Sequence, residues 1–473
     1  MKTLLINPSH ENASSDILPL GLCSISAMLK HNGFEDVKGI DLFWDKLEDY
    51  TEDIKKTDYI GVHVTSKLFD NSIELAGKIK KINPNVKIVF GGAHPTLYPK
   101  ECLDMDCVDF VIRGEGEFPF LNLVQCMDYK VIEGLCYNTV IKESFFVKDL
   151  NVLPFPDRDL FNMKRYAAYI FYPVFVPIMS SRSCPYNCNN CQPALRMICG
   201  SYRVRSPQNV IDEFIFLRDK YNVKRIWFND NDVTVNQKWL NEFCGLMIKN
   251  KIKTKWGCNG RGNELNEENM ALMKKAGCIS LQFGLEFCNE RVLTECLNKR
   301  TSFENSKKVI DIANRLKLRL NTYYMFGVPG STKEEEYTSI DEASKLRLNS
   351  ISFKAFQPYP MINMNNIAEK KGWLMAYEFA ELDEDHCFYN TDNWSPGFVE
   401  KDLVQYIKDK FKDEWVHDSV SEEGSVCLIF RNIKTEMHHS FVVYFGRQIL
   451  SFLKDFKFRH IKNILKGVYC VWT

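Results

Sequence analysis

The sequence predicts an α/β chain that begins with a doubly wound parallel sheet, continues as a partial (β/α)6 barrel and ends in a small C-terminal α+β domain. Its 473 residues exceed what one hydrophobic core accommodates. Apolar runs of strand length alternate with amphipathic stretches of helix length until about residue 360, where the alternation stops. We therefore expect a first domain at residues 1–125, a linker at 126–172, the barrel at 173–360 and a capping domain that contributes to substrate choice at 361–473.

The first domain has four predicted strands separated by helical stretches, which is the pattern of a parallel sheet with helices on both faces. Helical periodicity is clear at residues 19–34 and 70–84, which end at Gly or Pro. Such sheets bind ligands at the carboxyl ends of their strands, so the loops there are candidate ligand sites. The predicted strands are residues 2–8, 59–66, 86–92 and 109–117.

The segment from residue 173 to 360 repeats the strand–helix pattern six times, which favours a partial barrel over an open sheet. The linker before it contains NVLPFPDRDLF, in which two prolines interrupt any regular element. Helical stretches such as 207–221 and 266–277 separate the apolar runs. The predicted barrel strands are residues 174–182, 225–230, 254–260, 280–286, 319–327 and 350–356.

The composition argues against several classes of protein. Lys plus Arg equals Asp plus Glu at 61 each, so the bulk charge gives no sign of a nucleic-acid partner. No apolar run is long enough to span a bilayer, and the N-terminus turns polar within a few residues, unlike a signal peptide. We therefore expect the 17 cysteines to be reduced thiols and the chain to be cytoplasmic.

Three cysteines stand out from the other thiols by their spacing. Cys184, Cys188 and Cys191 follow the first predicted barrel strand, on the face where β/α folds place active sites. Thiolates suit zinc or iron–sulfur clusters, and Cys199 could complete a zinc site. A four-iron cluster usually takes four cysteines, so three would leave one iron open to a small molecule. The spacing favours such an open cluster; the alternative is a zinc knuckle in a non-enzymatic binding protein.

The motif CPYNCNNC resembles the cluster motif of the radical S-adenosylmethionine (SAM) superfamily. The resemblance implies a TIM-like barrel and a 4Fe–4S cluster on the three cysteines, which would be both metal ligands and catalytic residues. It also implies that the open iron chelates SAM, whose reductive cleavage yields a 5′-deoxyadenosyl radical. The implied cofactor contacts at later strand ends are Asn229 and Asp230 after the second strand, Arg261 after the third, Glu286 after the fourth, and Gly327 and Pro329 in a turn near the adenine.

The first domain resembles the cobalamin-binding domain found in front of many radical SAM cores, on the runs LPLGLCSISAMLKHNGF, GGAHPTLYP and DFVIRGEGE. The resemblance implies a Rossmann-like sheet whose glycines let the backbone approach a corrin ring or its nucleotide tail. The Asp-x-His-x-x-Gly signature, which supplies a lower cobalt ligand, is absent, and His10 lacks the flanking residues. The implied cofactor-binding residues are Thr65, Ser66, Gly91, Gly92 and Gly114.

Together the resemblances imply a cobalamin-dependent methyltransferase that acts on an unactivated carbon or phosphorus centre of a small, natural-product-like molecule. A radical cyclase or rearrangement enzyme on the same scaffold is the alternative. A methylthiotransferase fits less well because the first domain has no matching cysteine pattern. Relatives take electrons from a flavodoxin or ferredoxin, and we expect the same here. We also expect the basic stretch 448–467 to pack on the protein rather than on a membrane. Candidate substrate-lining residues are Tyr323, Tyr324, Gln357 and Tyr359.

Overall fold

The computed structural model describes most of the first 373 residues and three short later segments. Predictions for His10, for the stretch 448–467 and for most of the C-terminal domain lie outside the described residues. The described residues are 1–9, 17–163, 165–166, 175–359, 361–373, 403–411, 416–417 and 426–429.

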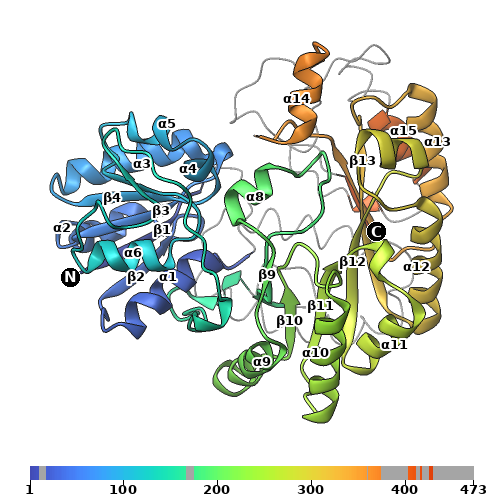
Figure 1. The fold of residues 1–473 in the computed structure, drawn as a ribbon, viewed down its shortest axis with the longest axis horizontal. Helices are drawn as coiled ribbons and strands as arrows, with labels where there is room; N and C mark the ends of the chain where they lie inside the picture. The colour runs from blue at the N-terminus through green and yellow to red at the C-terminus, as the bar shows by residue number, and fades with distance from the viewer. Residues whose placement is uncertain are drawn as a thin grey trace.

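The first sheet, at the left of Figure 1, has six strands in the order β2-β1-β3-β4-β5-β6. Five strands run parallel, and β6 is antiparallel to β5. Apolar side chains cover both faces: Leu5 of β1 packs in one core, and Leu4 and Ile6 pack in the other. The strands are β1 (Thr3–Asn7), β2 (Val37–Asp41), β3 (Tyr59–His63), β4 (Lys87–Gly91), β5 (Phe110–Ile112) and β6 (Leu135–Tyr137). The helices are α1 (Leu20–His31), α2 (Thr51–Lys55), α3 (Phe69–Ile82), α4 (Ala93–Leu97), α5 (Pro99–Leu103) and α6 (Glu117–Val124).

Two strands of this sheet were not predicted. β2 reads VKGID, so a lysine and a glycine interrupt its apolar run. Gly39 is nevertheless required, because a Cβ there would lie 2.7 Å from the Leu160 carbonyl oxygen of the linker. β6 has only three residues and extends the sheet into the segment expected to connect the two domains.

The second sheet has the order β15-β16-β14-β13-β12-β11-β10-β7 and curves into a partial barrel with helices outside it (Figure 1). Its six parallel strands are the six predicted from the sequence, and β16 joins the edge of β14 in the antiparallel direction. The parallel strands are β7 (Val176–Ile178), β10 (Arg225–Phe228), β11 (Lys255–Gly260), β12 (Cys278–Glu286), β13 (Arg319–Phe326) and β14 (Ser350–Ala355), and the edge strands are β15 (Val416–His417) and β16 (Val426–Ile429). The helices are α8 (Ala194–Cys199), α9 (Pro207–Tyr221), α10 (Gln237–Lys249), α11 (Glu267–Lys275), α12 (Phe303–Leu316), α13 (Lys333–Ser344), α14 (Asn363–Lys370) and α15 (Val404–Lys410).

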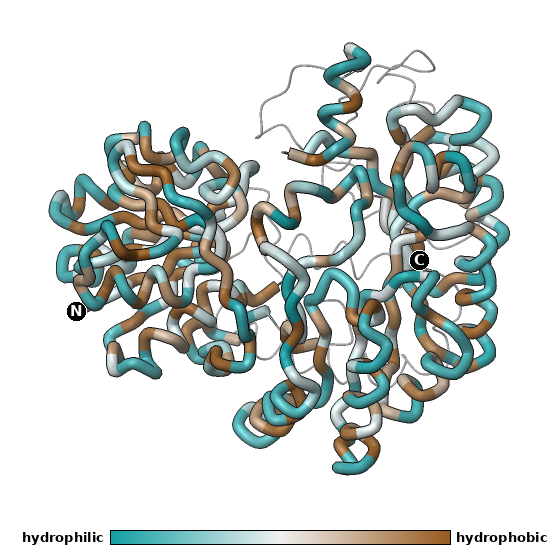
Figure 2. Tube along the Cα trace, in the orientation of Figure 1, coloured by the Kyte–Doolittle hydropathy of each residue, from teal (hydrophilic) through white to brown (hydrophobic). Residues whose placement is uncertain are grey.

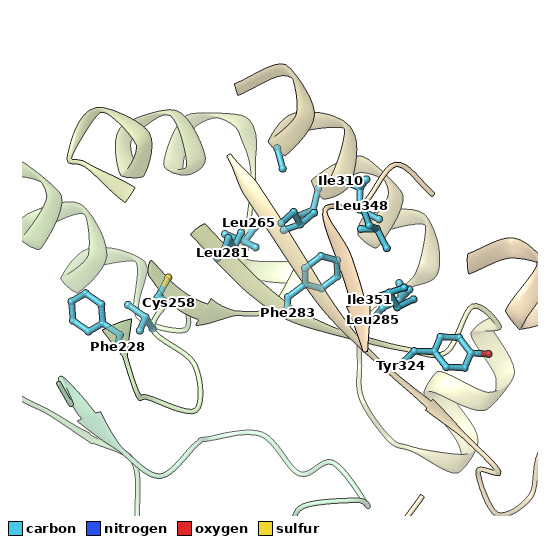
Figure 3. Close-up of a cluster of buried hydrophobic side chains, with 14 of the residues drawn as sticks. Phe228, Cys258, Leu265, Leu281, Phe283, Leu285, Ile310, Tyr324, Leu348 and Ile351 are labelled. Atoms are coloured by element: carbon cyan, nitrogen blue, oxygen red, sulfur yellow. The ribbon is translucent and has the colours of Figure 1, made fainter. Parts of the chain in front are cut away.

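Side chains alternate between the two faces of the barrel strands. Leu281, Phe283 and Leu285 of β12 pack toward the helices with Ile310 of α12, as Figure 3 shows. The hydropathy of the chain follows this arrangement, with apolar strands inside and polar residues on the outer helix surfaces (Figure 2). The alternate residues Gln282 and Gly284 lie on the opposite face of β12 and are less deeply buried.

Short-range caps define where the barrel helices begin. Ser206 accepts a hydrogen bond from the Asn209 backbone N–H before α9, which starts with a proline. Thr332 and Glu335 form a capping box at α13. Among the described residues, no helix has both the length and the apolar character needed to cross a bilayer.

The linker is anchored to both domains through adjacent residues. Asp157 accepts hydrogen bonds from Ser26 and Lys30 of α1, each at 2.7 Å. Arg158 is buried and donates to Glu213 of α9 at 2.7 Å, and Arg205 donates to the same carboxylate at 2.5 Å. A fully buried carboxylate between two guanidinium groups therefore fixes the linker to the barrel.

Candidate functional site

The three predicted ligand cysteines lie together in the loop between the short strand β8 (Ser181–Arg182) and α8. All three are half-buried. The pKa of Cys184 is raised to about 12, mainly by burial and to a smaller extent by the nearby Asp232 and Cys188. Burial and the other two thiols raise the pKa of Cys191 to about 12. The thiols are thus close enough to oppose each other's ionisation, which a bound metal would reverse by taking up their thiolates.

The loop that carries the cysteines, residues 183–193, is called the cluster loop here. Backbone and side-chain hydrogen bonds hold it from two sides. The Asn189 backbone N–H donates to the Leu297 carbonyl oxygen at 2.9 Å, and its side-chain amide donates to the Cys296 carbonyl oxygen at 2.8 Å. On the other side, Asn363 N–H of α14 donates to the Gln192 carbonyl oxygen at 2.7 Å. Hydrogen bonds to two other segments therefore fix the position of the loop that carries the cysteines.

The number of thiols fits a cluster with an open iron. The thiolates of an iron–sulfur cluster each bind a different iron, and a four-iron cluster usually takes four cysteines. Three neighbouring thiols in one loop would therefore leave one iron of a 4Fe–4S cluster free for a further ligand.

Arg261 follows β11 and lies over the cluster loop. Its guanidinium stacks on the Tyr186 ring at 3.8 Å from the centroid, and Nη1 lies 3.6 Å from Cys188 Sγ. The Tyr186 hydroxyl donates to Glu264, which fixes the ring. Only 7% of Arg261 is exposed, yet its Nε and Nη2 have no hydrogen-bond partner. Buried guanidinium N–H groups without partners fit an anionic ligand group such as the carboxylate of SAM.

Glu286 ends β12 on the same side of the barrel. Its backbone φ is +61°, a left-handed conformation that is unusual for glutamate. Lys299 pairs with the Glu286 carboxylate and also donates to the Gly284 carbonyl oxygen at 2.9 Å. Lys299 was missed by sequence reasoning, because it lies 13 positions from Glu286 and belongs to no motif.

The two residues predicted after the second barrel strand have different surroundings. Asn229 donates its backbone N–H to Ile178 at 2.8 Å and its side chain is exposed. Asp230 is buried and accepts from Ser180 N and Oγ, and from the backbone N–H and hydroxyl of Ser181. Burial raises its pKa, although these donors act in the opposite direction. Its carboxylate thus fixes the strand that leads into the cluster loop.

The predicted adenine turn follows β13, and a buried carboxylate supports it. Gly327 has a φ of +68° and Pro329 is buried. Glu336 of α13 accepts from Val328 N at 3.1 Å and from Ser331 Oγ at 2.6 Å. Its second carboxylate oxygen is buried without a partner, and burial raises the pKa of Glu336 to about 7. Glu336 therefore stabilises the turn through hydrogen bonds to Val328 and Ser331.

The predicted cobalamin residues gather at the carboxyl ends of β3, β4 and β5. Thr65 and Ser66 are half-buried after β3. A Cβ at Gly91 would meet nothing within 4 Å, whereas one at Gly92 would lie 2.8 Å from the Val64 carbonyl oxygen. Gly92 has a φ of +113° and Gly114 one of +85°. The open space at Gly91 fits a ligand that approaches the backbone closely, while Gly92 and Gly114 are needed for the backbone itself.

Two further residues organise this end of the first sheet. His94 is fully buried: it packs on Phe69 at 4.1 Å between ring centroids, and its Nδ1 lies 3.1 Å from Ser66 Oγ. Burial lowers the pKa of His94 to about 4, so the ring is neutral at pH 7. Thr96 Oγ1 donates to the Gly92 carbonyl oxygen at 2.7 Å and accepts from Gly114 N at 3.0 Å. Thr96 therefore joins two of the predicted cobalamin loops.

One candidate substrate residue was predicted on the wrong face. Tyr324 is buried toward the helices, and its hydroxyl donates to Ser339 Oγ of α13 at 2.6 Å. Its neighbour Tyr323 is 42% exposed on the opposite face, which also carries Met325 next to Asn190 of the cluster loop. Tyr359 is exposed and Gln357 is buried. Strand alternation therefore keeps Tyr323 as a candidate substrate-lining residue and removes Tyr324.

Two protein families match separate parts of the chain. The B12 binding domain matches residues 10–124, which run from just after β1 to the end of α6. The radical SAM superfamily matches residues 178–343, which cover the barrel from β7 to α13. The cofactors of these two families are a 4Fe–4S cluster, SAM and cobalamin, as predicted from the sequence.

Three curated relatives align with about three quarters of the chain. An uncharacterized methyltransferase of Pyrococcus horikoshii is 31% identical over 379 residues, 76% of this chain and 81% of the relative. The cytidylyl-2-hydroxyethylphosphonate methyltransferase of Streptomyces wedmorensis is 27% identical over 76% of this chain and 79% of its own. The anaerobic magnesium-protoporphyrin IX monomethyl ester cyclase of Rubrivivax gelatinosus is 25% identical over 77% of this chain and 69% of its own.

A solved structure has the same two-domain fold. It is the radical SAM methyltransferase TsrM of Kitasatospora setae with cobalamin and a 4Fe–4S cluster bound. It superimposes with a TM-score of 0.67 at 16% identity and covers 91% of this chain and 84% of TsrM. With the cluster loop, the B12-binding sheet and the Pyrococcus relative in agreement, the chain belongs to the radical SAM superfamily, among its enzymes with an N-terminal B12-binding domain.

Proposed function

We propose that this enzyme is a cobalamin-dependent radical SAM methyltransferase that methylates an unactivated carbon or phosphorus centre of a small molecule. The observation that carries the proposal is the contact between the two cofactor regions. Helix α4, which begins directly after Gly92, packs against α8, which follows Cys191 (Figure 1). Both candidate cofactor sites therefore border the same domain junction, where a substrate can reach both.

When bound, the cluster and SAM would supply the radical that abstracts a hydrogen atom, and methylcobalamin would supply the methyl group. The chain's own residues have positioning roles. Arg261 would neutralise the carboxylate of SAM through its unpaired N–H groups. Glu286, oriented by Lys299, would accept hydrogen bonds from the same ligand. The open space at Gly91 and the hydroxyl of Ser66 would receive the nucleotide tail of cobalamin.

The products formed from SAM test this proposal even before the substrate is identified. The chain is purified without oxygen, reconstituted with iron, sulfide and hydroxocobalamin, and incubated with SAM and a flavodoxin or ferredoxin as electron donor. We expect about four irons and one corrinoid per chain, S-adenosylhomocysteine from methyl transfer and 5′-deoxyadenosine from radical cleavage. The control is the Cys184→Ala, Cys188→Ala, Cys191→Ala variant, which should lose the iron and the 5′-deoxyadenosine. Wild type with no more iron than this variant would overturn the proposal.

A cyclase is the second candidate, because the Rubrivivax relative is a cyclase. It predicts 5′-deoxyadenosine without S-adenosylhomocysteine, and a product that has lost hydrogen without gaining carbon. A methyltransferase product gains one CH₂ instead. The ratio of the two SAM-derived products therefore separates the two candidates.

A further inference from the structure

Four charged side chains form a buried ionic network between the B12-binding domain and the cluster loop. Glu115 and Glu117 follow β5 of the first domain, and Arg182 and Arg203 lie on the paired strands β8 and β9 (Arg203–Val204). Arg203 binds Glu115 with both Nη atoms at 2.9 Å. Arg182 binds Glu117 at 2.6 Å and Glu115 at 3.1 Å. The four side chains are 4–15% exposed, so the network is shielded from solvent.

The charges in this network balance. Two guanidinium groups face two carboxylates, and no other ionised side chain is needed for neutrality. Removing one member would leave a buried charge without compensation, which is strongly unfavourable. Removing Glu117 together with Arg182 leaves the bidentate Glu115–Arg203 pair intact and neutral. Joint substitution of Glu117 and Arg182 therefore removes their contact between the two domains without leaving an unpaired charge.

On one side the network continues into the predicted cobalamin loops. Glu115 directly follows Gly114, and Glu117 lies two residues further along the chain. The Gly114 N–H donates to Thr96 Oγ1, which in turn donates to the Gly92 carbonyl oxygen. A displacement of the Gly91–Gly92 loop by a bound ligand would therefore be transmitted to both carboxylates through two hydrogen bonds.

On the other side the network ends at the cluster ligands. Arg182 is two residues before Cys184. The intervening Ser183 has a φ of +71°, and its hydroxyl donates to the Gly200 carbonyl oxygen at 2.7 Å. Arg203 also donates to the Cys199 carbonyl oxygen at the end of α8. Both arginines are thus tied to the two ends of the segment that carries the three cysteines.

We propose that Arg182 and Glu117 are positioning residues through which corrinoid binding by the first domain and cluster assembly in the barrel stabilise each other. The proposal rests on the proposed function, because it requires both cofactors. It follows from a continuous path of hydrogen bonds and adjacent residues that runs from Gly92 through Thr96, Gly114 and Glu117 to Arg182 and Cys184. Buried ionic and hydrogen-bonded groups that two sites both contact are a physical route for such coupling.

The test measures hydroxocobalamin binding to the full chain, once with the cluster reconstituted and once after anaerobic removal of iron with a chelator. Coupling between sites is typically about 5- to 150-fold. We therefore expect wild type to bind hydroxocobalamin at least about fivefold more tightly with the cluster present. For the Arg182→Gln, Glu117→Gln double variant, the dissociation constants of hydroxocobalamin with and without the cluster should be nearly equal. The matched control is Arg315→Gln, Glu267→Gln, which removes an exposed ion pair between α12 and α11 and should keep the wild-type ratio.

The outcomes separate this inference from the proposed function. If wild type binds hydroxocobalamin equally with and without the cluster, the coupling is absent and the inference is wrong, although the methyltransferase proposal survives. A double variant that keeps the wild-type ratio would also overturn the inference. If wild type binds no corrinoid in either state, the proposed function and the inference fail together. A wild-type protein that binds hydroxocobalamin equally well with and without the cluster refutes the inference even where the double variant does not fold.

Discussion

Replacement of Arg261 by glutamine gives the sharpest test of the candidate SAM site. The substitution removes the positive charge and the two N–H groups that are buried without a protein partner. It keeps all three thiol ligands and removes only one 3.6 Å contact with Cys188 Sγ, so the cluster should still assemble. We therefore expect normal iron content and weakened SAM binding in the same variant.

The size of the effect follows from the contacts of Arg261. A hydrogen bond to a charged group is worth about 1.5–3 kcal/mol, which corresponds to about a 10- to 150-fold change in the dissociation constant of SAM. The guanidinium also stacks on Tyr186 at 3.8 Å, and loss of that stacking adds about 0.5–2 kcal/mol to the destabilisation of the loop. Arg261→Lys keeps the charge and loses the planar fork, so it should fall between wild type and Arg261→Gln.

The assay is equilibrium binding of SAM to anaerobically reconstituted protein, with iron determined on the same sample. Arg315→Gln is the control, because Arg315 is 57% exposed on α12 and pairs only with Glu267 among the described ion pairs. An Arg261→Gln variant with full iron content and wild-type SAM affinity would refute the reasoning. It would mean that the unpaired N–H groups of Arg261 face no ligand.

Three further predictions concern stability and the first domain. Because burial raises the pKa of Glu336 to about 7, the folded chain keeps a proton that the unfolded carboxyl has lost, so the stability from this group falls as pH rises from about 4.5 to 7. Glu336→Gln removes that slope, and its melting temperature relative to wild type should rise between pH 5 and pH 8. Glu213→Gln leaves the two buried guanidinium groups of Arg158 and Arg205 without their shared carboxylate partner, so it should lower the free energy of unfolding in denaturant by about 3–5 kcal/mol. The control Asp212→Asn, on the exposed side of α9, should not show this loss. Gly92→Ala should lower the free energy of unfolding by about 1–3 kcal/mol, because Gly92 has a positive φ, and should also weaken hydroxocobalamin binding. The control Gly77→Ala, in the middle of α3, has open space for a Cβ and should stabilise the chain slightly.

The parts of the fold that the sequence predicts are those whose signals are local. All six parallel barrel strands alternate with amphipathic helices, and their ends place Arg261 and Glu286 at the barrel opening. The cysteine triplet is likewise a local pattern. β2 escaped prediction because Lys38 and Gly39 break its apolar run, and only its pairing with β1 makes it a strand.

Contacts between distant segments could not be read from the sequence. Lys299 reaches Glu286 because a π-helical segment, Val292–Cys296, brings the chain back toward β12. Arg182 meets Glu117 across 65 positions of sequence. Tyr323 and Tyr324 are indistinguishable by residue type, and only the side on which the helices pack decides which of the two is buried.

Polar residues at the strand ends of this barrel have two different roles, and hydrogen-bond satisfaction separates them. Asp230 lies two residues after the end of β10, and Ser180 and Ser181 already supply donors to its carboxylate. A carboxylate with that many donors has little to gain from a ligand, so it acts as a support. Arg261 ends the next strand with two buried N–H groups that the protein leaves unpaired, and a buried donor of that kind is unfavourable unless a ligand accepts from it. We therefore expect the ligand to bind on the Arg261 side of the barrel opening, while the Asp230 carboxylate holds the strand that leads into the cluster loop.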